Sequence, residues 1–396
     1  MTTRVAGLFG VSYKTMVLGN LTNRDSPGLQ HRHWIMSILN PIHNCSRVMQ
    51  NPLVLHHEKM GAELAHGRVP LWFSNTSDEY LMLGKSAGFA DLSHLGVMAV
   101  DGKDRLPFLN GLVTNDVGKL YPGSGVHSLL LNTKARVIAD LYLYLKDESL
   151  LVDTGDVSAQ NVKSFLDRFI VTEDVRLSDL TDELVRLTVQ GPRATDVIKT
   201  VLGVNVQELQ PLRHLSIGPS LVVNRDRTGL GGYDLFIPRD EAEPVWQGLL
   251  LKAQDIGAGP VGLSALDVYR IERGTPRMGV DVNENTIVLE AGYADAISYS
   301  KGCYMGQEVV ARATHIGRVN KKLVQLQLET ETPALPGSPI VHEDNEVGRI
   351  TSSAYSPKSR SVVGLGYVTR EFAKENARIE VNSAGLIVPA RVTKVD

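Results

Sequence analysis

The octapeptide Lys301-Gly302-Cys303-Tyr304-Met305-Gly306-Gln307-Glu308 places one of only two cysteines in the chain between two glycines. The residues that follow have high helix propensity, so we expect Cys303 at the mouth of a helix N-terminus. The helix dipole and the ammonium of Lys301 both favour a thiolate over a thiol, which indicates a reactive cysteine. The glycines allow a sharp turn and the close approach of a flat ligand. A buried structural cysteine beside a turn is the alternative interpretation.

Length and composition exclude several classes of function. The chain has 396 residues, more than one hydrophobic core usually serves, which predicts two or three subdomains. Apolar content of 43% and charged content of 21% are typical of soluble globular proteins. A net charge of −3 argues against nucleic-acid binding through bulk charge. No apolar run approaches the roughly 18 residues of a membrane span, so we expect no membrane partner.

The cysteine content bears on compartment and metal binding. Cys45 and Cys303 do not form a disulfide framework, and reduced thiols fit a cytoplasmic or matrix-like compartment. The sequence contains no CxxC, HExxH or P-loop motif, and we predict no metal site. One cysteine in the core region cannot by itself hold a stable iron–sulfur cluster, which usually needs about four protein ligands.

Residues 1–52 form an extension that differs from the rest of the chain. The first 50 residues carry five basic residues and a single acid, Asp25. Such a segment is typical of a mitochondrial transit peptide, which would place the protein in the matrix instead of the cytoplasm. Glycines and prolines interrupt any long amphipathic helix, however, and favour a disordered tail. A start codon assigned too early is a further alternative, with Met49 or Met60 as later starts.

The rest of the chain is patterned as a folded protein. Residues 137–145 alternate leucines with tyrosines as in a half-buried strand, and an apolar stripe predicts a helix over 157–171. The mixed order of strands and helices predicts an α+β region over residues 53–320. Over residues 321–396, short apolar runs are punctuated by prolines and glycines, which predicts a β-barrel of six strands.

Several segments resemble the glycine-cleavage T-protein (aminomethyltransferase) superfamily. They are residues 87–96, 112–117, 129–143, 268–276 and 289–292. The octapeptide is similar to the K-G-C-Y-x-G-Q-E signature of the YgfZ branch, the folate-binding iron–sulfur maintenance proteins. The resemblance covers roughly residues 55–396. It implies a three-module, folate-binding α+β fold around a central hole for tetrahydrofolate, with the β-barrel as the C-terminal part.

The resemblance also implies roles for individual residues. Asp116 falls where T-proteins keep a carboxylate beside the reactive end of folate, where it can bond to N5 or stabilise an iminium charge. A turn or cap is the alternative for Asp116. Arg227 begins a run like R-T-G-Y-T-G-E, but the glutamate that grips the pterin is missing and Asp234 is near without being aligned. This departure weighs against aminomethyl transfer.

The candidate site residues follow from these resemblances. Cys303, Lys301 and Asp116 are the catalytic candidates. For Arg227, a surface salt bridge is the alternative to a folate carboxylate. Arg270 and Arg273 share one helix face, for which solvation is the default. The candidates for folate binding are Asp116, Arg227, Tyr233, Arg270, Arg273, Tyr304 and Gln307.

Two functions from different classes compete. The first is a folate-binding protein that supports iron–sulfur cluster assembly or repair, with Cys303 as a transient thiol and iron–sulfur client or assembly proteins as partners. The second is an enzyme, a tetrahydrofolate-dependent aminomethyltransferase that takes a one-carbon unit from a lipoylated carrier protein. The octapeptide favours the first function, and Asp116 favours the second. A folate-dependent demethylase is a third possibility that no residue favours.

Overall fold

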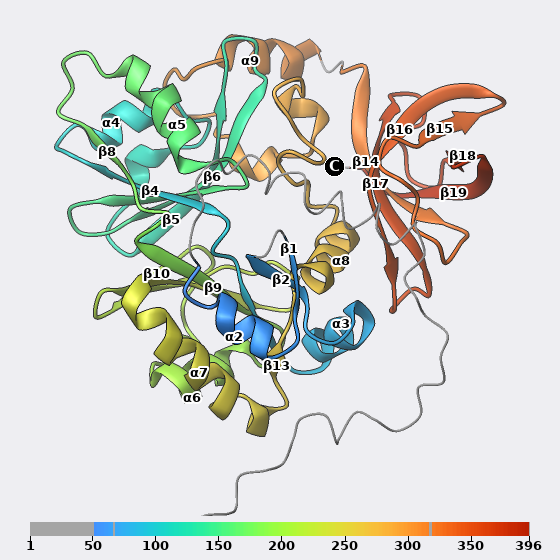
Figure 1. Ribbon diagram of the computed structural model, residues 1–396. Coiled ribbons are helices and arrows are strands. Elements are labelled where there is room, and N and C mark those ends of the chain that lie inside the picture. Colours follow the sequence, from blue (N-terminus) through green and yellow to red (C-terminus); the bar gives the residue numbers. More distant parts are fainter. Residues whose placement is uncertain (1–50, 66–67, 317–318, 396) are drawn as a thin grey trace, which may run out of the picture.

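The computed structural model describes residues 51–65, 68–316 and 319–395, so most of the 1–52 extension lies outside the described residues. Two β-sheets with their helices and one β-barrel form three modules (Figure 1). None of the helices described is long and apolar enough to cross a membrane.

The first module is a five-stranded antiparallel sheet in the order β5-β6-β7-β4-β8. Its strands are β4 (Gly96–Asp101), β5 (Ser124–Leu131), β6 (Val137–Leu145), β7 (Leu150–Gly155) and β8 (Arg176–Asp179). Alternate residues of β6 are buried from Val137 to Leu143, as its sequence pattern predicts, and Tyr144 is buried as well. The buried face packs on α4 (Arg105–Asn110) and α5 (Ala159–Leu166).

The helix predicted over 157–171 is shorter in the structure. Ser158 caps α5, because its hydroxyl accepts a hydrogen bond from the backbone N–H of Asn161. The α-helix ends at Leu166, and the 3₁₀ turn η4 (Asp167–Phe169) completes the apolar stripe. Such a turn is a common end for an α-helix.

The second module is a six-stranded sheet in the order β10-β11-β12-β9-β3-β13. Its strands are β3 (Gly88–Asp91), β9 (Leu184–Gln190), β10 (His214–Ile217), β11 (Ser220–Asn224), β12 (Gly232–Pro238) and β13 (Gly259–Pro260). Its helices α2 (Val54–Lys59), α6 (Ala194–Leu202) and α7 (Ala242–Lys252) lie together on one side, where Trp246 is fully buried (Figure 1). Tyr144 and Phe236 pack the two sheets against each other.

The third module is a closed barrel in the order β14-β17-β16-β15-β18-β19. Its strands are β14 (Lys321–Leu328), β15 (Pro339–His342), β16 (Asn345–Ser356), β17 (Ser361–Thr369), β18 (Arg378–Ser383) and β19 (Leu386–Val395). The predicted α+β class with a C-terminal six-stranded barrel is confirmed.

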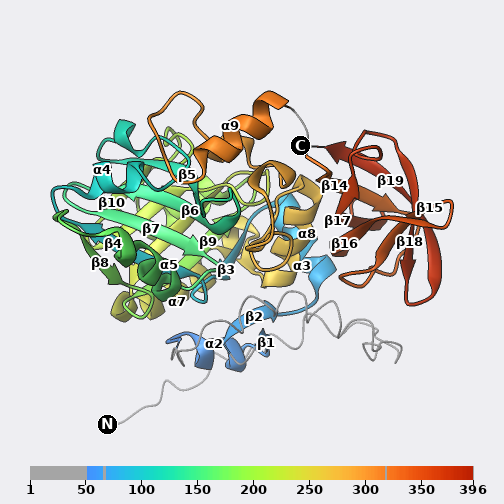
Figure 2. The same ribbon diagram turned by 90° about the horizontal axis from the view of Figure 1, so that it is seen from above.

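Helix α8 (Leu263–Arg273) lies between the barrel and the second module (Figure 2). One hydrophobic cluster contains residues of α8, α3 (Thr76–Lys85), β2 (Val69–Trp72) and the barrel. Strand β2 pairs with β1 (Glu63–Ala65). Tyr80 of α3 stacks on Tyr269 of α8, with ring centroids 4.3 Å apart. The helix therefore has strands of the barrel on one side and α3, β2 and the second module on the other. After α8, the chain returns to the first sheet and forms α9 (Gln307–Ile316).

Candidate functional site

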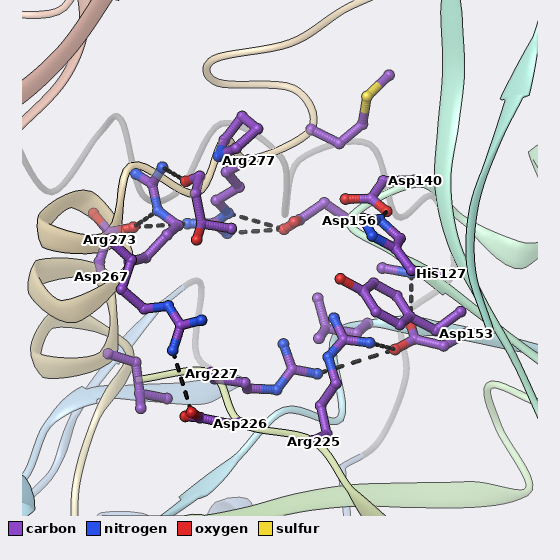
Figure 3. Close-up of a pocket in the computed structure, with 18 of the residues that line it drawn as sticks. His127, Asp140, Asp153, Asp156, Arg225, Asp226, Arg227, Asp267, Arg273 and Arg277 are labelled. Carbon is purple, nitrogen blue, oxygen red and sulfur yellow. Dashed lines mark hydrogen bonds and ion pairs between the residues drawn. The ribbon is translucent and has the colours of Figure 1, made fainter. Parts of the chain in front are cut away.

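A cavity of about 460 Å³ lies where the three modules meet. The five-stranded sheet supplies residues of β5, β6 and β7, and the loop between β11 and β12 supplies three consecutive charged residues. Helix α8 and the segment after it form the opposite wall, and Lys394 of the barrel closes one side. Figure 3 shows that the labelled side chains point inward from these walls.

One part of the wall is apolar. Leu92, Leu95, Leu263 and Leu266 line it together with the imidazole of His94. Burial lowers the pKa of His94 to about 4, and Asp156 only partly offsets this effect. The ring is therefore neutral at physiological pH, and this part of the cavity suits an uncharged, flat group.

A second part of the wall surrounds Asp153, whose carboxylate is buried among three arginines. Arg186 donates to it at 2.8 Å, and the guanidinium groups of Arg225 and Arg227 lie 3.8 and 4.0 Å away. Burial raises the pKa of Asp153, but the arginines more than offset it, so the net shift is downward. The carboxylate therefore stays ionised and holds the positions of Arg225 and Arg227 in the cavity wall.

His127 forms a third charged group with two carboxylates. Its Nε2 lies 2.7 Å from Asp140 and its Nδ1 lies 3.0 Å from Asp295. Burial alone lowers the pKa of His127, but the two carboxylates outweigh it and raise the pKa to about 9. The imidazole of His127 also stacks on the ring of Tyr142, with ring centroids 4.2 Å apart. The guanidinium of Arg225 lies 3.0 Å from the centre of the Tyr142 ring. His127 is therefore held as an imidazolium at a fixed place in the wall.

The arginines of the α8 wall are also paired. Arg270 bonds to Asp267 at 2.7 Å, to Asp281 at 2.5 Å and to the hydroxyl of Ser352 in the barrel. Arg277 bonds to Asp156 of the first module at 2.9 Å (Figure 3). The Arg277–Asp156 ion pair therefore links the segment after α8 to the first module, and the hydrogen bond from Arg270 to Ser352 links α8 to the barrel.

Three of the predicted folate-binding residues line the cavity, namely Arg227, Arg270 and Arg273. Arg227 forms a two-pronged ion pair with the fully buried carboxylate of Asp234, at 3.0 and 2.6 Å. Arg227 thus forms an ion pair within the protein, as the alternative expected, but with a buried partner and not at the surface. Arg273 is the most accessible of the three, with 40% of its side chain exposed and Asp226 3.3 Å away.

Tyr233 does not lie at the cavity. Its ring belongs to the hydrophobic core between β12 and the helices of the second module. Its hydroxyl donates to the backbone carbonyl of Val206 and lies 3.0 Å from the hydroxyl of Thr195. Alternation along the strand explains this placement, because Tyr233 and Asp234 point to opposite faces of the sheet.

The octapeptide lies outside the cavity wall and fastens α9 to the first module. The helix predicted after Gly306 is present, since α9 begins at Gln307, and Cys303, four residues before it, is exposed. The ammonium of Lys301 bonds to three backbone carbonyls, so it is occupied away from the thiol. The expectations that Lys301 keeps Cys303 ionised and that Cys303 faces a pterin slot are therefore not met by this geometry.

The other members of the octapeptide have local structural contacts. Tyr304 is buried in the cluster beneath α9. The side-chain carbonyl of Gln307 accepts a hydrogen bond from the backbone N–H of Tyr304. Gly306 has a φ of +83°, and an added Cβ would meet the carbonyl oxygen of Asn132 at 2.7 Å. Only glycine permits this backbone conformation and this close approach.

Asp116 is not among the residues that line the cavity and lies at the start of the 3₁₀ turn η3 (Val117–Lys119). Its carboxylate is 17% exposed and pairs with Lys119 at 3.0 Å. The neighbouring amide of Asn115 donates to the backbone carbonyls of His127 and Asp295, both of which line the cavity. The structure thus brings Asp116 next to the wall and leaves its role a prediction.

Sequence reasoning missed the acidic and histidine part of the wall. Asp140 and Tyr142 sit on the same face of β6, opposite the predicted apolar face, so the alternation contained a signal for them. His127, Asp153 and Arg225 come from different strands and loops, and no local pattern joins them.

Comparisons with known proteins match almost the whole described chain. The family profile described as "GCVT N-terminal domain" matches residues 53–301, and the "Glycine cleavage T-protein C-terminal barrel domain" matches residues 321–395. An aminomethyltransferase of Shouchella clausii is 28% identical over 362 residues, covering 88% of this chain and 97% of that protein. One of Thermotoga maritima is 28% identical over 357 residues, covering 87% and 96%.

The fold matches a solved structure as well. The glycine cleavage system aminomethyltransferase T from Bartonella henselae superposes with a TM-score of 0.80 at 25% identity, covering 87% of this chain and 96% of that one. Because the matched relatives are aminomethyltransferases, the prediction of an iron–sulfur assembly or repair function, with iron–sulfur partners, is wrong.

Proposed function

The chain belongs to the glycine cleavage T-protein family, and from this premise we propose that it is a tetrahydrofolate-dependent aminomethyltransferase. Its donor would be an aminomethyl group carried on the lipoyl arm of a partner protein. The observation that carries the proposal is the match to aminomethyltransferases over nearly their full lengths. A matched fold alone would not fix a reaction, so the fit of the cavity matters as well.

The cavity is suited to tetrahydrofolate as a substrate. Its volume of about 460 Å³ is within the usual range for small-molecule sites. The apolar wall with neutral His94 suits a flat ring, and Tyr142 and the arginines supply polar contacts along its edge. Arg273 has the accessibility and charge to pair with a glutamyl carboxylate.

We assign to the Asp116 carboxylate the role of stabilising the reacting carbon. In the transfer, the bond between the aminomethyl carbon and the lipoyl sulfur breaks, and the sulfur leaves as a thiol. The carbon forms bonds to N5 and N10 of tetrahydrofolate, and the nitrogen leaves as ammonium. A carboxylate next to the cavity can stabilise the iminium charge that develops on the carbon.

The departure at the R-T-G run now has a structural description. Asp234 is not among the residues that line the cavity, and its buried carboxylate is paired with Arg227, so this chain needs another acceptor for the pterin edge. Asp140 and Asp295, which flank His127 in the wall, carry the carboxylate oxygens for that task. The compartment that we propose is the cytoplasm, on the ground of its few cysteines.

The test uses the purified chain, tetrahydrofolate and a lipoylated carrier protein loaded with aminomethyl. We expect stoichiometric release of ammonia and formation of methylenetetrahydrofolate. Asp116→Asn should lower kcat by about 100-fold or more, the usual size for a group that stabilises transition-state charge. Lys134→Met, on an exposed turn, is the matched surface control. No ammonia above background with all three components present would refute the proposal.

A further inference from the structure

The side chain of Lys301 makes an unusually complete set of contacts. Its Nζ donates to the backbone carbonyls of Asn110 at 2.7 Å, of Val113 at 2.9 Å and of Asn115 at 2.7 Å. An ammonium has three N–H donors, so all three are used. The side chain is 9% exposed, and its charge therefore lies inside the protein against these carbonyls.

The three carbonyls belong to one short segment, which runs from the end of α4 to Asp116. Asn110 is the last residue of α4, where carbonyl oxygens lack a partner within the helix. Val113 and Asn115 follow in the irregular chain that leads to the carboxylate. One cation thus holds both the start and the end of the segment that presents Asp116.

Apart from the ion pair between Asp116 and Lys119, the other side-chain contacts of this segment come from neutral groups. The hydroxyl of Ser128 accepts from the backbone N–H of Asn115, and the hydroxyl of Thr114 donates to the carbonyl of Ala296. The side-chain carbonyl of Asn110 accepts from the backbone N–H of Val117. These bonds connect the segment to β5, to Ala296 and to itself, whereas Lys301 binds three of its carbonyls.

We propose that Lys301 is a positioning residue for Asp116: its three hydrogen bonds hold the 110–116 segment so that the carboxylate stays beside the cavity. The proposal rests on the proposed function for the role of Asp116. It differs from activation of Cys303, because the ammonium is bonded to carbonyls and the exposed thiol takes no part.

The charge of Lys301 fits this task at physiological pH. Burial lowers the pKa of Lys301 to about 8, and the nearby carboxylate of Asp116 partly offsets that effect. The ring of Tyr304 lies 5.4 Å from Nζ and covers the ammonium on another side. The ammonium is therefore charged at pH 7, with one N–H for each carbonyl.

A double-mutant cycle tests the proposal. Lys301→Met should lower kcat roughly 10- to 100-fold with KM for tetrahydrofolate changed less than about threefold, since a misplaced group costs rate more than binding. Adding Lys301→Met to Asp116→Asn should lower kcat less than about threefold further, because the lysine acts through that carboxylate. A kcat for Lys301→Met within twofold of wild type, or fully additive losses, would overturn the proposal.

Two controls separate positioning from other effects. Lys119→Met removes the other ammonium near Asp116, which is 75% exposed, and should change kcat less than about threefold. If Lys119→Met and Lys301→Met lower kcat equally, the loss of a positive charge near Asp116 explains the effect, and positioning by Lys301 is rejected. In Lys301→Ala, added methylammonium should restore kcat at least about fivefold, whereas sodium should not, because three carbonyls select a cation with N–H donors.

The outcome is distinguishable from failure of the proposed function. If wild type releases no ammonia, the aminomethyltransferase proposal fails. Hydrogen exchange then still tests whether the three hydrogen bonds of Lys301 hold the 110–116 segment. Amide protons of residues 111–117 should then exchange at least about tenfold faster in Lys301→Met, with protection in the barrel unchanged. Unchanged exchange rates in that segment would overturn the proposal that Lys301 holds it in place. If Lys301→Met does not fold, Lys301→Ala purified with methylammonium takes its place in both measurements.

Discussion

Replacing His127 with Gln removes a buried charge whose contribution to stability depends on pH. The imidazolium is 9% exposed and bonds to Asp140 at 2.7 Å and to Asp295 at 3.0 Å. Burial lowers the pKa of His127, yet the two carboxylates raise it overall to about 9. The unfolded chain has the ordinary histidine pKa of about 6.5.

The size and sign of the effect follow from this difference. Between pH 6.5 and 9, folded His127 holds a proton that the unfolded chain releases, so stability falls as pH rises. A difference of about 2.5 pH units at about 1.4 kcal/mol per unit gives about 3 kcal/mol. This contribution is fully present below pH 6.5 and is lost as the pH rises through 9.

The assay is thermal unfolding of wild type and His127→Gln at pH 6, 7, 8 and 9. We expect the Tm advantage of wild type to shrink by roughly 6–12 °C across this range, since about 1 kcal/mol shifts Tm by about 2–4 °C in a chain region of this size. Lys301 has the opposite slope above pH 8, but it is present in both proteins and cancels in the difference. His342→Gln, in the barrel, is the matched histidine-to-glutamine control in another module. A wild-type advantage that does not vary with pH would refute the assignment of His127 as a buried imidazolium.

Three further changes have defined outcomes. Gly306→Ala should lower the free energy of unfolding in urea by more than about 1 kcal/mol, because φ is +83° and the added Cβ would lie 2.7 Å from a backbone oxygen. In Gly302→Ala the added Cβ has no atom within 4 Å, so this control should leave stability unchanged. Arg186→Met leaves the buried carboxylate of Asp153 without its 2.8 Å partner and should cost about 3–5 kcal/mol by the same measurement. Cys303→Ser should keep ammonia release within about twofold of wild type, and a loss above tenfold would restore a role for the exposed thiol.

Much of the fold was contained in local patterns. The alternation over 137–145 predicts β6 because the leucine face of that strand packs on the core of the first module, whereas the tyrosine face is turned to the second sheet and the cavity. The short apolar runs after residue 321 predict the barrel for the same reason, since each run is one strand of a closed sheet. These signals depend only on neighbours along the chain, which a sequence displays directly.

The site was harder to predict because its contacts are distant in sequence. The carboxylate of Asp153 meets Arg186 from the second sheet, and His127 meets Asp295 from the segment before α9. Nothing in the spacing of these residues indicates the pairing. The octapeptide misled for a related reason: its lysine, tyrosine and second glycine are fixed by structural contacts, and the cysteine among them is exposed.

Charge pairing in the cavity limits how a substrate can bind. The guanidinium groups of Arg227 and Arg270 are satisfied by buried carboxylates at 2.5–2.7 Å, and a ligand would have to break these pairs at high cost to use them as free charges. The pair between Arg273 and Asp226 is longer, at 3.3 Å, and both partners are partly exposed, so it exchanges partners at low cost. A ligand that suits this cavity therefore has a neutral ring for the inner wall and an anionic group for the Arg273 end. Tetrahydrofolate has both features, because its pterin is uncharged and its glutamyl tail carries carboxylates.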